Sequence, residues 1–438
     1  MNYHNMSINN KGHLEIGGCD LVDLASEYGT PLYVLDEELV VDRAEQYLQA
    51  LKGLPEYEIA YASKAFISLG MAKLIANLGL CIDVASGGEL YIVLKAGFPA
   101  ERIYFHGNNK SIEELKQALN ANVGRIVVDN LYELELLSKL ATESNRTANI
   151  LIRLTPGIDA YTHTYIRTGQ LDSKFGISLA HDQAFEAVKL AAQLRNIELK
   201  GVHCHIGSQI FDVSSYPVAV DIMMRFISKV KKEGIELREL NLGGGLGIRY
   251  IPNDQPVSIG DFGELLTKSL MQAAQKYNIK IPKIIVEPGR SIVGEAGTTL
   301  YRIGAIKEIK GGRTYAAVDG GMTDNIRVAL YQARYHGAAA NKAASENEKL
   351  YTIVGKSCES SDILISDIYL PKLEAGDILA VFVTGAYNYS MANNYNAIPR
   401  SPVVIAYKGQ SELLIERETY QDLIRLHKIP ARWCKNEF

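Results

Sequence analysis

The chain has 438 residues, 47% hydrophobic and 22% charged, with a formal net charge of −4. This ordinary globular composition gives no reason to expect a nucleic acid or an anionic membrane as a partner. Five scattered cysteines without a CxxC pair argue against a disulfide framework or a structural zinc site, and they indicate a reducing, cytoplasmic environment. The polar N-terminus and the lack of a long apolar run predict neither a secretion signal nor a membrane span.

The first 54 or so residues predict one strand and one long helix. Residues 1–12 are polar and are expected to be loose. Residues 31–35 form an apolar run, and Asp36 follows as a helix N-cap. Apolar side chains at helical spacing over residues 39–51 then predict a helix of about four turns that stops near Gly53.

A regular alternation of apolar runs and amphipathic helices follows. The predicted strands cover residues 58–63, 80–85, 102–105, 125–129, 149–154, 199–206, 239–242 and 284–286. The clearest helical patterns cover residues 111–119, 131–140, 183–194, 216–232 and 261–277. Eight β-then-α units over about 250 residues predict a closed (β/α)₈, TIM-like barrel. An open doubly wound sheet is the alternative, although it usually has fewer strands.

The pattern changes after residue 297. Strands without long helices between them are predicted at 298–309, 313–318, 350–354, 378–383 and 403–407. We therefore expect three parts: residues 1–37 joining a β domain, residues 38–294 forming the barrel, and residues 295–438 forming a mainly antiparallel β domain. The polar, Ala-rich residues 336–348 are expected to be a mobile surface loop.

Ionisable, polar or glycine residues follow nearly every predicted barrel strand, which is where barrel enzymes place catalytic residues. They are Lys64, Asp83, His106, Asp129, Arg153, His203, His205, Gly243, Gly244, Gly245, Glu287 and Arg290. Lys64 follows the first strand. If buried, its pKa falls and its amine becomes able to form a Schiff base with an aldehyde cofactor. A lysine that reaches the surface from a strand end is the alternative.

Three further barrel motifs each leave an alternative open. Residues 243–245 are three glycines after the seventh strand, where barrels often bind phosphate, although a flexible turn fits as well. His203 and His205 share one face of a strand. A metal would need a third ligand, whereas one imidazole could pack on a ring-shaped cofactor, and His203 is better explained as a core histidine. Glu287 could pair with a protonated pyridine nitrogen or with Arg290.

The sequence after the predicted barrel carries three more motifs. Cys358 and Glu359 lie in a polar segment that ends in Asp362, so the thiol is expected to be accessible. Arg327 and Tyr331 could bind a substrate carboxylate or could belong to a surface salt bridge. Tyr387 follows the strand predicted at 378–383, and its ring could be part of the core.

Together these segments resemble the diaminopimelate decarboxylases, a family of fold-type III pyridoxal-phosphate-dependent decarboxylases. The matching motifs are Tyr-Ala-Ser-Lys-Ala-Phe at 61–66, His-Cys-His-Ile-Gly-Ser-Gln at 203–209, Gly-Gly-Gly-Leu-Gly at 243–247, Glu-Pro-Gly-Arg at 287–290, Cys-Glu-Ser-x-Asp at 358–362 and Gly-Ala-Tyr-x-Tyr-Ser-Met at 385–391. They occur in the order that the family has and span about residues 30–400. The resemblance implies an alanine-racemase-like architecture of a barrel plus a β domain.

The resemblance also implies roles for individual residues. Lys64, Cys358 and His205 would be catalytic: Lys64 would hold pyridoxal 5′-phosphate covalently, His205 would stack on its ring and Cys358 would return a proton to Cα. The cofactor would be bound by Lys64, His205, Ser208, Gly243, Gly244, Gly245, Glu287, Pro288, Gly289, Arg290 and Tyr387. The substrate would be bound by Arg290, Arg327, Tyr331, Glu359 and Tyr387.

The implied reaction converts meso-2,6-diaminopimelate to L-lysine and CO₂, the last step of lysine biosynthesis. The implied working unit is a homodimer in which Cys358 and Glu359 come from the partner subunit. Three alternatives stay open. They are a decarboxylase of ornithine, arginine, lysine or carboxynorspermidine on the same fold, a Schiff-base aldolase without the cofactor, and a non-catalytic relative. No metal is expected.

Overall fold

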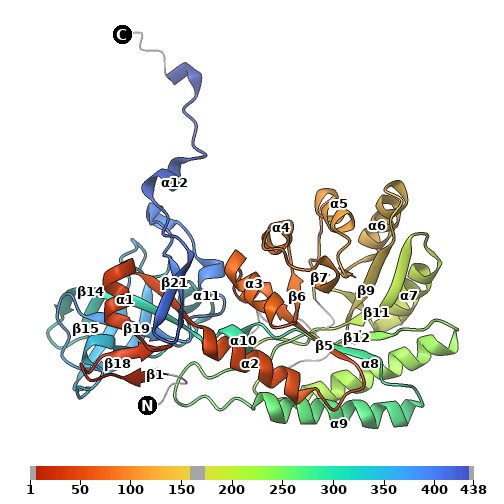
Figure 1. The fold of residues 1–438 in the computed structure, drawn as a ribbon, viewed down its shortest axis with the longest axis horizontal. Helices are drawn as coiled ribbons and strands as arrows, with labels where there is room; N and C mark the ends of the chain where they lie inside the picture. The colour runs from red at the N-terminus through yellow and green to blue at the C-terminus, as the bar shows by residue number, and fades with distance from the viewer. Residues whose placement is uncertain (1–5, 158–172, 434–438) are drawn as a thin grey trace. The chain divides into compact units, whose positions relative to one another are not determined.

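The computed structural model describes residues 6–157 and 173–433 (Figure 1). It divides into two compact units. The barrel unit comprises Asp36–Gly297 and Val383–Ser390, and the β unit comprises Met1–Leu35, Thr298–Phe382 and Met391–Phe438. In the described residues, none of the helices is both long enough and apolar enough to cross a membrane.

Eight parallel strands form the barrel. They are β5 (Tyr57–Ala62), β6 (Cys81–Val84), β7 (Ile103–Phe105), β8 (Arg125–Val128), β9 (Ala148–Thr155), β11 (Ile197–His203), β12 (Glu239–Asn241) and β13 (Lys283–Val286). Each pairs with the next, and β13 pairs with β5, so the sheet closes on itself. The short β10 (Ile177–Ser178) pairs with β9. The predicted barrel is thus confirmed, and the open sheet is excluded.

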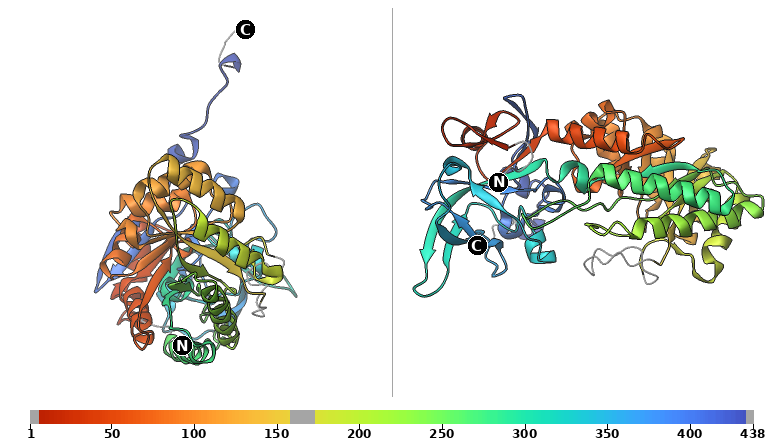
Figure 2. Two further views of the ribbon diagram at one scale, coloured as in Figure 1. Left: turned by 90° about the vertical axis from the view of Figure 1, so that its right-hand side faces the viewer. Right: turned by 90° about the horizontal axis from the view of Figure 1, so that it is seen from below.

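Helices surround these strands, as the left view of Figure 2 shows along the barrel. They are α2 (Glu37–Ala50), α3 (Leu69–Asn77), α4 (Gly87–Lys95), α5 (Ile112–Ala121), α6 (Leu131–Glu143), α7 (Gln183–Gln193), α8 (Ser215–Lys232) and α9 (Ile259–Tyr277), with the one-turn α10 (Arg290–Val293) after β13. Local sequence fixes several of the helix starts. Asp36 accepts a hydrogen bond from the Leu39 N–H, as predicted for an N-cap, and Ser111 and Glu114 form a capping box.

The β unit is built on a second sheet. Its strands run in the order β18 (Ile363–Leu370), β17 (Lys349–Val354), β15 (Thr314–Val318), β14 (Gly297–Glu308), β4 (Leu32–Asp36), β20 (Val403–Tyr407) and β21 (Gln410–Ile415). The strands β15 and β17 pair in parallel, whereas β14 with β15, β17 with β18 and β20 with β21 pair antiparallel. The early strand β4 joins this sheet, as the sequence predicted. Short helices lie outside the sheet: α1 (Leu21–Tyr28), α11 (Arg327–Tyr331) and α12 (Tyr420–Ile424).

Two sequence predictions for the β unit are wrong. Residues 336–348 are not a mobile loop, because β16 (Gly337–Ala339) pairs with β19 (Ile378–Phe382), and the following Ala340 is buried. Alanine side chains are small enough for that close packing, but they give no apolar alternation to find in the sequence. The N-terminus is ordered from β1 (Met6–Ile8), which pairs antiparallel with β2 (Leu14–Ile16), and β2 pairs with β3 (Cys19–Asp20).

A buried ion pair connects the loop after β7 to the first turn of α6. Lys110 Nζ lies 2.8 Å from Glu133 Oε1 and also donates to the carbonyls of Gly107 and Val127. Both side chains are almost completely buried, with 2% and 3% of their surface exposed. Burial lowers the pKa of Lys110 and raises that of Glu133. Each group therefore depends on the other to remain charged.

We expect Lys110→Met to lower the free energy of unfolding by about 3–5 kcal/mol, because it leaves the Glu133 carboxylate buried without its counter-ion. Lys139 and Glu143 on α6 provide a matched control, since they form an ion pair at 3.9 Å whose side chains are 72% and 55% exposed. Lys139→Met should change stability by less than about 0.5 kcal/mol. Urea unfolding of both variants measures the two changes in the free energy of unfolding. Equal changes would show that the buried pair contributes no more to stability than the exposed pair.

Candidate active site

Lys64 lies directly after β5, in a single 3-10 turn (Ser63–Ala65) at the carboxyl end of the strand. The surrounding motif is fixed by buried neighbours. Tyr61 donates through its hydroxyl to the Phe66 carbonyl at 2.7 Å, and the Tyr387 N–H donates to the Ala65 carbonyl at 2.8 Å. The backbone at Lys64 is therefore held in place, while its side chain keeps an exposed surface at the mouth of the barrel.

The expected fall in the pKa of Lys64 is wrong. Loss of water contact would lower it, but Asp83, Tyr387 and Glu287 outweigh that effect and raise the pKa from its ordinary value. The exposed Lys64 side chain therefore carries a cation near acidic groups, and its nitrogen must lose a proton before it can attack an aldehyde.

Glu287, at the end of β13, accepts three hydrogen bonds inside the barrel. Its Oε1 lies 2.7 Å from His106 Nε2 and 2.6 Å from Asn241 Nδ2, and its Oε2 lies 3.2 Å from His203 Nε2. Burial alone would raise the pKa of Glu287, but the two histidines outweigh it and hold the pKa well below its usual range. The described partners of the carboxylate are these three side chains and not Arg290, so the Glu287–Arg290 pair left open by the sequence does not form.

The two histidines of the β11 segment have different surroundings. His203 is buried, and burial lowers its pKa to about 4, so it is neutral at neutral pH. Its Nε2 bonds Glu287, but its buried Nδ1 has no hydrogen-bond partner among the described residues, so it is not the fully satisfied core histidine that we expected. His205 is half-buried, and burial followed by the charge of Lys64 holds its pKa well below the usual value. His205 therefore offers a neutral ring.

Arg290, at the start of α10, contacts both polar and aromatic side chains. Its guanidinium donates to Ser208 Oγ at 2.9 Å and to the Tyr250 hydroxyl, and it lies 4.7 Å from the centre of the Tyr387 ring. Arg290 is 7% exposed, and its Nε is buried without a hydrogen-bond partner in the part of the chain described. A buried guanidinium with an unused donor is suited to binding an anion.

The glycine run after β12 passes between two other strand ends. A Cβ atom at Gly244 would lie 2.1 Å from the Glu287 carbonyl oxygen, so the close approach of this loop to β13 requires glycine. The Gly243 N–H donates to Asn241 Oδ1 at 2.9 Å, and the Gly244 N–H donates to His205 Nδ1 at 3.3 Å. The run therefore brings Asn241, His205 and the loop backbone together beside Glu287.

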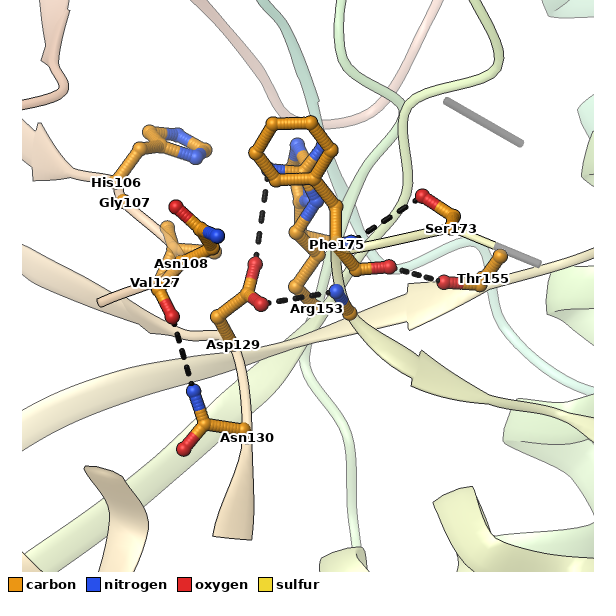
Figure 3. A network of polar contacts seen from close by, with 12 residues as sticks. His106, Gly107, Asn108, Val127, Asp129, Asn130, Arg153, Thr155, Ser173 and Phe175 are labelled. Carbon is orange, nitrogen blue, oxygen red and sulfur yellow. Dashed lines mark hydrogen bonds and ion pairs between the residues drawn. The ribbon is translucent and has the colours of Figure 1, made fainter. Parts of the chain in front are cut away.

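A second polar network lies at the ends of β8 and β9 (Figure 3). Arg153 faces Asp129 at 3.8 Å, and its guanidinium lies 4.4 Å from the centre of the Phe175 ring. Asp129 also accepts the Gly176 N–H at 3.0 Å, and Thr155 donates to the Phe175 carbonyl at 2.6 Å. These contacts fix residues 173–176 and hold the half-buried Arg153 near the carboxylates of the barrel mouth.

In the β unit, Asp362 organises the segment that carries Cys358 and Glu359. Its buried carboxylate accepts the N–H groups of Met322 at 2.7 Å and Ser357 at 2.9 Å. Cys358 is exposed, as predicted, and its N–H donates to Asn396 Oδ1 at 2.7 Å. Glu359 is exposed as well. The thiol and the carboxylate are thus presented on a segment whose backbone is fixed by Asp362.

Arg327 and Tyr331 mark the two ends of α11. Arg327 is 7% exposed and donates to the Tyr335 hydroxyl at 2.7 Å. Tyr331 is half-buried. Arg327 is thus buried within the β unit, so the exposed surface salt bridge that the sequence left open is not what the structure contains.

The structure brings together the predicted barrel residues and adds others. Within the barrel unit lie Lys64, His205, Ser208, Gly243, Gly244, Gly245, Glu287, Pro288, Gly289, Arg290 and Tyr387. Within the β unit lie Arg327, Tyr331, Cys358 and Glu359. His106 was predicted only as one of the polar residues at strand ends, and no role was predicted for Asn241 or Tyr250. The position of His106 at a strand end was the available signal, whereas nothing in the sequence linked Asn241 or Tyr250 to the site.

A closed barrel with an accessible lysine, an ionised buried carboxylate and a buried arginine with an unused donor at one mouth has the groups that a barrel enzyme with a pyridoxal-type cofactor needs. Residues 38–294 match the family "Pyridoxal-dependent decarboxylase, pyridoxal binding domain", and the chain belongs to this family.

Individual relatives within this family are similar to the chain over nearly its whole length. The chain is 52% identical over 421 residues to the diaminopimelate decarboxylase of Bacillus subtilis, covering 95% of this chain and 96% of that one. It is 45% identical over 436 residues to the enzyme of the same name from Synechocystis, covering 97% and 92%. The crystal structure of diaminopimelate decarboxylase from M. jannaschii superimposes with a TM-score of 0.92 at 38% identity, covering 98% of both chains.

Proposed function

We propose that this protein removes CO₂ from meso-2,6-diaminopimelate and yields L-lysine, the last step of lysine biosynthesis, with pyridoxal 5′-phosphate as its cofactor. The observation that carries the proposal is a set of three groups at the barrel mouth that match the aldehyde, ring nitrogen and phosphate of this cofactor. They are the accessible Lys64, the ionised Glu287 and Arg290 with its unused donor. Relatives named diaminopimelate decarboxylase match almost the full length of the chain. Two solved relatives of that name were crystallised with L-lysine, which supports lysine as the product.

The described residues fit the cofactor chemically. Arg290 has an unused buried Nε donor beside Ser208, which suits a phosphate, together with Gly243, Gly244, Gly245, Pro288 and Gly289. Glu287 is an ionised carboxylate that suits a protonated ring nitrogen. His205 is a neutral imidazole that suits stacking on an aromatic ring, and Tyr387 lies beside Arg290.

The bound cofactor supplies a conjugated ring that accepts the electron pair left on Cα when CO₂ departs. The chain's own residues do the rest. With the cofactor bound, Lys64 would hold it covalently, and the Glu287 carboxylate would stabilise a positive charge on its ring nitrogen. Arg290, Arg327, Tyr331 and Tyr387 bind the substrate, with Arg327 on a carboxylate. Glu359 binds the distal ammonium group, and the Cys358 thiol returns a proton to Cα.

The same proposal includes a homodimer in which Cys358 and Glu359 act in the site of the partner subunit. A dimer of this kind has two equivalent sites by its two-fold symmetry. We further propose residues 38–294 as the cofactor-binding barrel, with residues 1–37 and 295–438 as the β domain. Four described cysteines are free thiols, which supports a cytoplasmic enzyme.

Decarboxylases of other basic amino acids are the nearest alternative. A lysine/ornithine decarboxylase from Vibrio vulnificus shares the fold, with a TM-score of 0.75 at 24% identity. A substrate panel separates the activities. With pyridoxal phosphate supplied, meso-diaminopimelate should release CO₂ faster than ornithine, arginine, lysine or carboxynorspermidine. A faster release from any of the others would replace the proposed substrate. Protein whose absorbance spectrum shows no bound pyridoxal phosphate, and which releases no CO₂ from any of them, would favour the aldolase.

Arg327→Ala tests how the substrate is distinguished. Removing one charged partner of a desolvated carboxylate costs about 2–5 kcal/mol, so kcat/KM for diaminopimelate should fall far more than any residual turnover of lysine. Arg334 is exposed and close in sequence, so Arg334→Ala is the matched control and should leave both rates near wild type. An equal loss on the two substrates would show that Arg327 acts by packing on Tyr335 instead.

A further inference from the structure

The Glu287 carboxylate has one hydrogen-bonding position left. A carboxylate accepts about four hydrogen bonds, two on each oxygen. Oε1 already receives His106 Nε2 at 2.7 Å and Asn241 Nδ2 at 2.6 Å. Oε2 receives His203 Nε2 at 3.2 Å. Among the residues that the structure describes, these are the donors to the carboxylate, so the remaining acceptor position is on Oε2.

Proton positions follow from this arrangement. Because the pKa of Glu287 is held far below its usual range, the carboxylate is ionised and can only accept. His203 must therefore carry its proton on Nε2 and leave Nδ1 bare, which agrees with a buried Nδ1 that has no partner.

The two imidazoles also fix each other. The rings of His106 and His203 meet edge to face, with centres 4.9 Å apart and planes at 69°. His106 and His203 are 7% and 1% exposed, and Asn241 is fully buried. Asn241 is held in turn by the Gly243 N–H at 2.9 Å. Three buried donors from three different strand ends thus restrict the rotation of the Glu287 side chain.

We propose that His106 and His203 are positioning residues that hold the ionised Glu287 so that Oε2 alone is presented to the protonated ring nitrogen of the cofactor. This inference rests on the proposed function. It adds the two side chains that orient Glu287 and the carboxylate oxygen that faces the ring nitrogen. Neither histidine touches the cofactor in this account, because both act through the carboxylate.

The test compares two ligands and four variants. His106→Leu and His203→Leu remove the donor, whereas His106→Gln and His203→Gln keep an amide N–H near the position of Nε2. Apoprotein is titrated with pyridoxal 5′-phosphate and with its deaza analogue, in which carbon replaces the ring nitrogen, and the dissociation constants are measured by absorbance. The analogue keeps the aldehyde and the phosphate, so it reports every contact except the one to Glu287.

We expect each leucine variant to bind pyridoxal phosphate about ten- to a hundredfold more weakly, which corresponds to losing one hydrogen bond to a charged group. Binding of the deaza analogue should change by less than about threefold, and the glutamine variants should recover most of the preference for pyridoxal phosphate. Leucine variants that weaken both ligands equally, or neither, would overturn the inference while leaving the proposed function intact. Wild-type protein that binds no pyridoxal phosphate would overturn both.

One further outcome would also overturn the inference. The ligand atoms of His106, His203 and Glu287 all lie within 4.8 Å of one another, a separation that a shared metal ion could bridge. Metal analysis of the protein as purified decides between the two assignments. The hydrogen-bonded arrangement predicts no stoichiometric metal and unchanged cofactor affinity after chelation. A bound metal ion that either leucine variant loses would assign the cluster to metal binding instead.

Discussion

Lys64→Ala protein should have no measurable decarboxylase activity and should show no cofactor absorbance band that borohydride can trap. The amine is the group that the proposed function makes covalent, and its loss removes the nucleophile outright, so a fall of at least about 10⁴-fold is expected. Lys64 is exposed at the barrel mouth, so its removal creates no buried cavity and the variant should fold. Absorbance spectra and CO₂ release measure the two effects.

Lys73 provides the control for this experiment. It lies on α3, shortly after Lys64, and its side chain is exposed to solvent. Lys73→Ala should keep the absorbance band and wild-type activity. Borohydride-treated wild-type protein should carry the added mass on the peptide that contains Lys64. A label on another lysine, or an active Lys64→Ala protein, would contradict the assigned role.

Cys358→Ala should be severely impaired, with kcat reduced by about 10²–10⁴-fold, the usual contribution of a positioned proton donor. The thiol is exposed in the isolated chain, so the substitution should not lower stability. Cys204 is a buried free cysteine, which makes Cys204→Ala a useful comparison for the loss of a thiol as such. The rate of CO₂ release and the identity of the amino-acid product report the effect of each variant.

Mixing the Lys64→Ala and Cys358→Ala variants tests whether the site is shared between subunits. If Lys64 and Cys358 act together across a two-fold interface, about half of the reassembled dimers from an equal mixture are hybrids. In each hybrid, one site contains both substitutions and the other contains neither. Half of the dimers therefore have one intact site of two, and activity should return to about a quarter of wild type. If both residues act within one chain, the mixture should show no recovery, once size measurements confirm that subunits have exchanged.

The barrel was predictable because each strand is a short apolar run buried on both faces, and each helix carries an apolar stripe. Strand ends were predictable to within a few residues, as β8 shows, observed at Arg125–Val128 where 125–129 was expected. The strands of the β unit were harder to predict. β18 and β21 were missed, and Ala-rich β16 was taken for a loop, because pairing in a sheet depends on partners that are distant in sequence.

Some residues of the candidate site could be predicted from the sequence, and others could not. Lys64, Glu287 and Arg290 could be found because each follows a strand directly. The donors to Glu287 could not be identified from the sequence, since His106, His203 and Asn241 lie 181, 84 and 46 residues away from it. Only the closed order of β7, β11, β12 and β13 brings them to one carboxylate. The pKa of Lys64 was mispredicted for the same reason, because its direction depends on which charges surround the amine.

One measurement tests the central claim most directly. Purified protein is incubated with pyridoxal phosphate and with meso-diaminopimelate labelled at its carboxyl carbons, and both labelled CO₂ and the amino-acid product are quantified. We predict one CO₂ and one L-lysine for each diaminopimelate consumed, with no D-lysine, and no turnover by Lys64→Ala. Fully cofactor-loaded protein that releases no CO₂, or CO₂ released without L-lysine, would contradict the account.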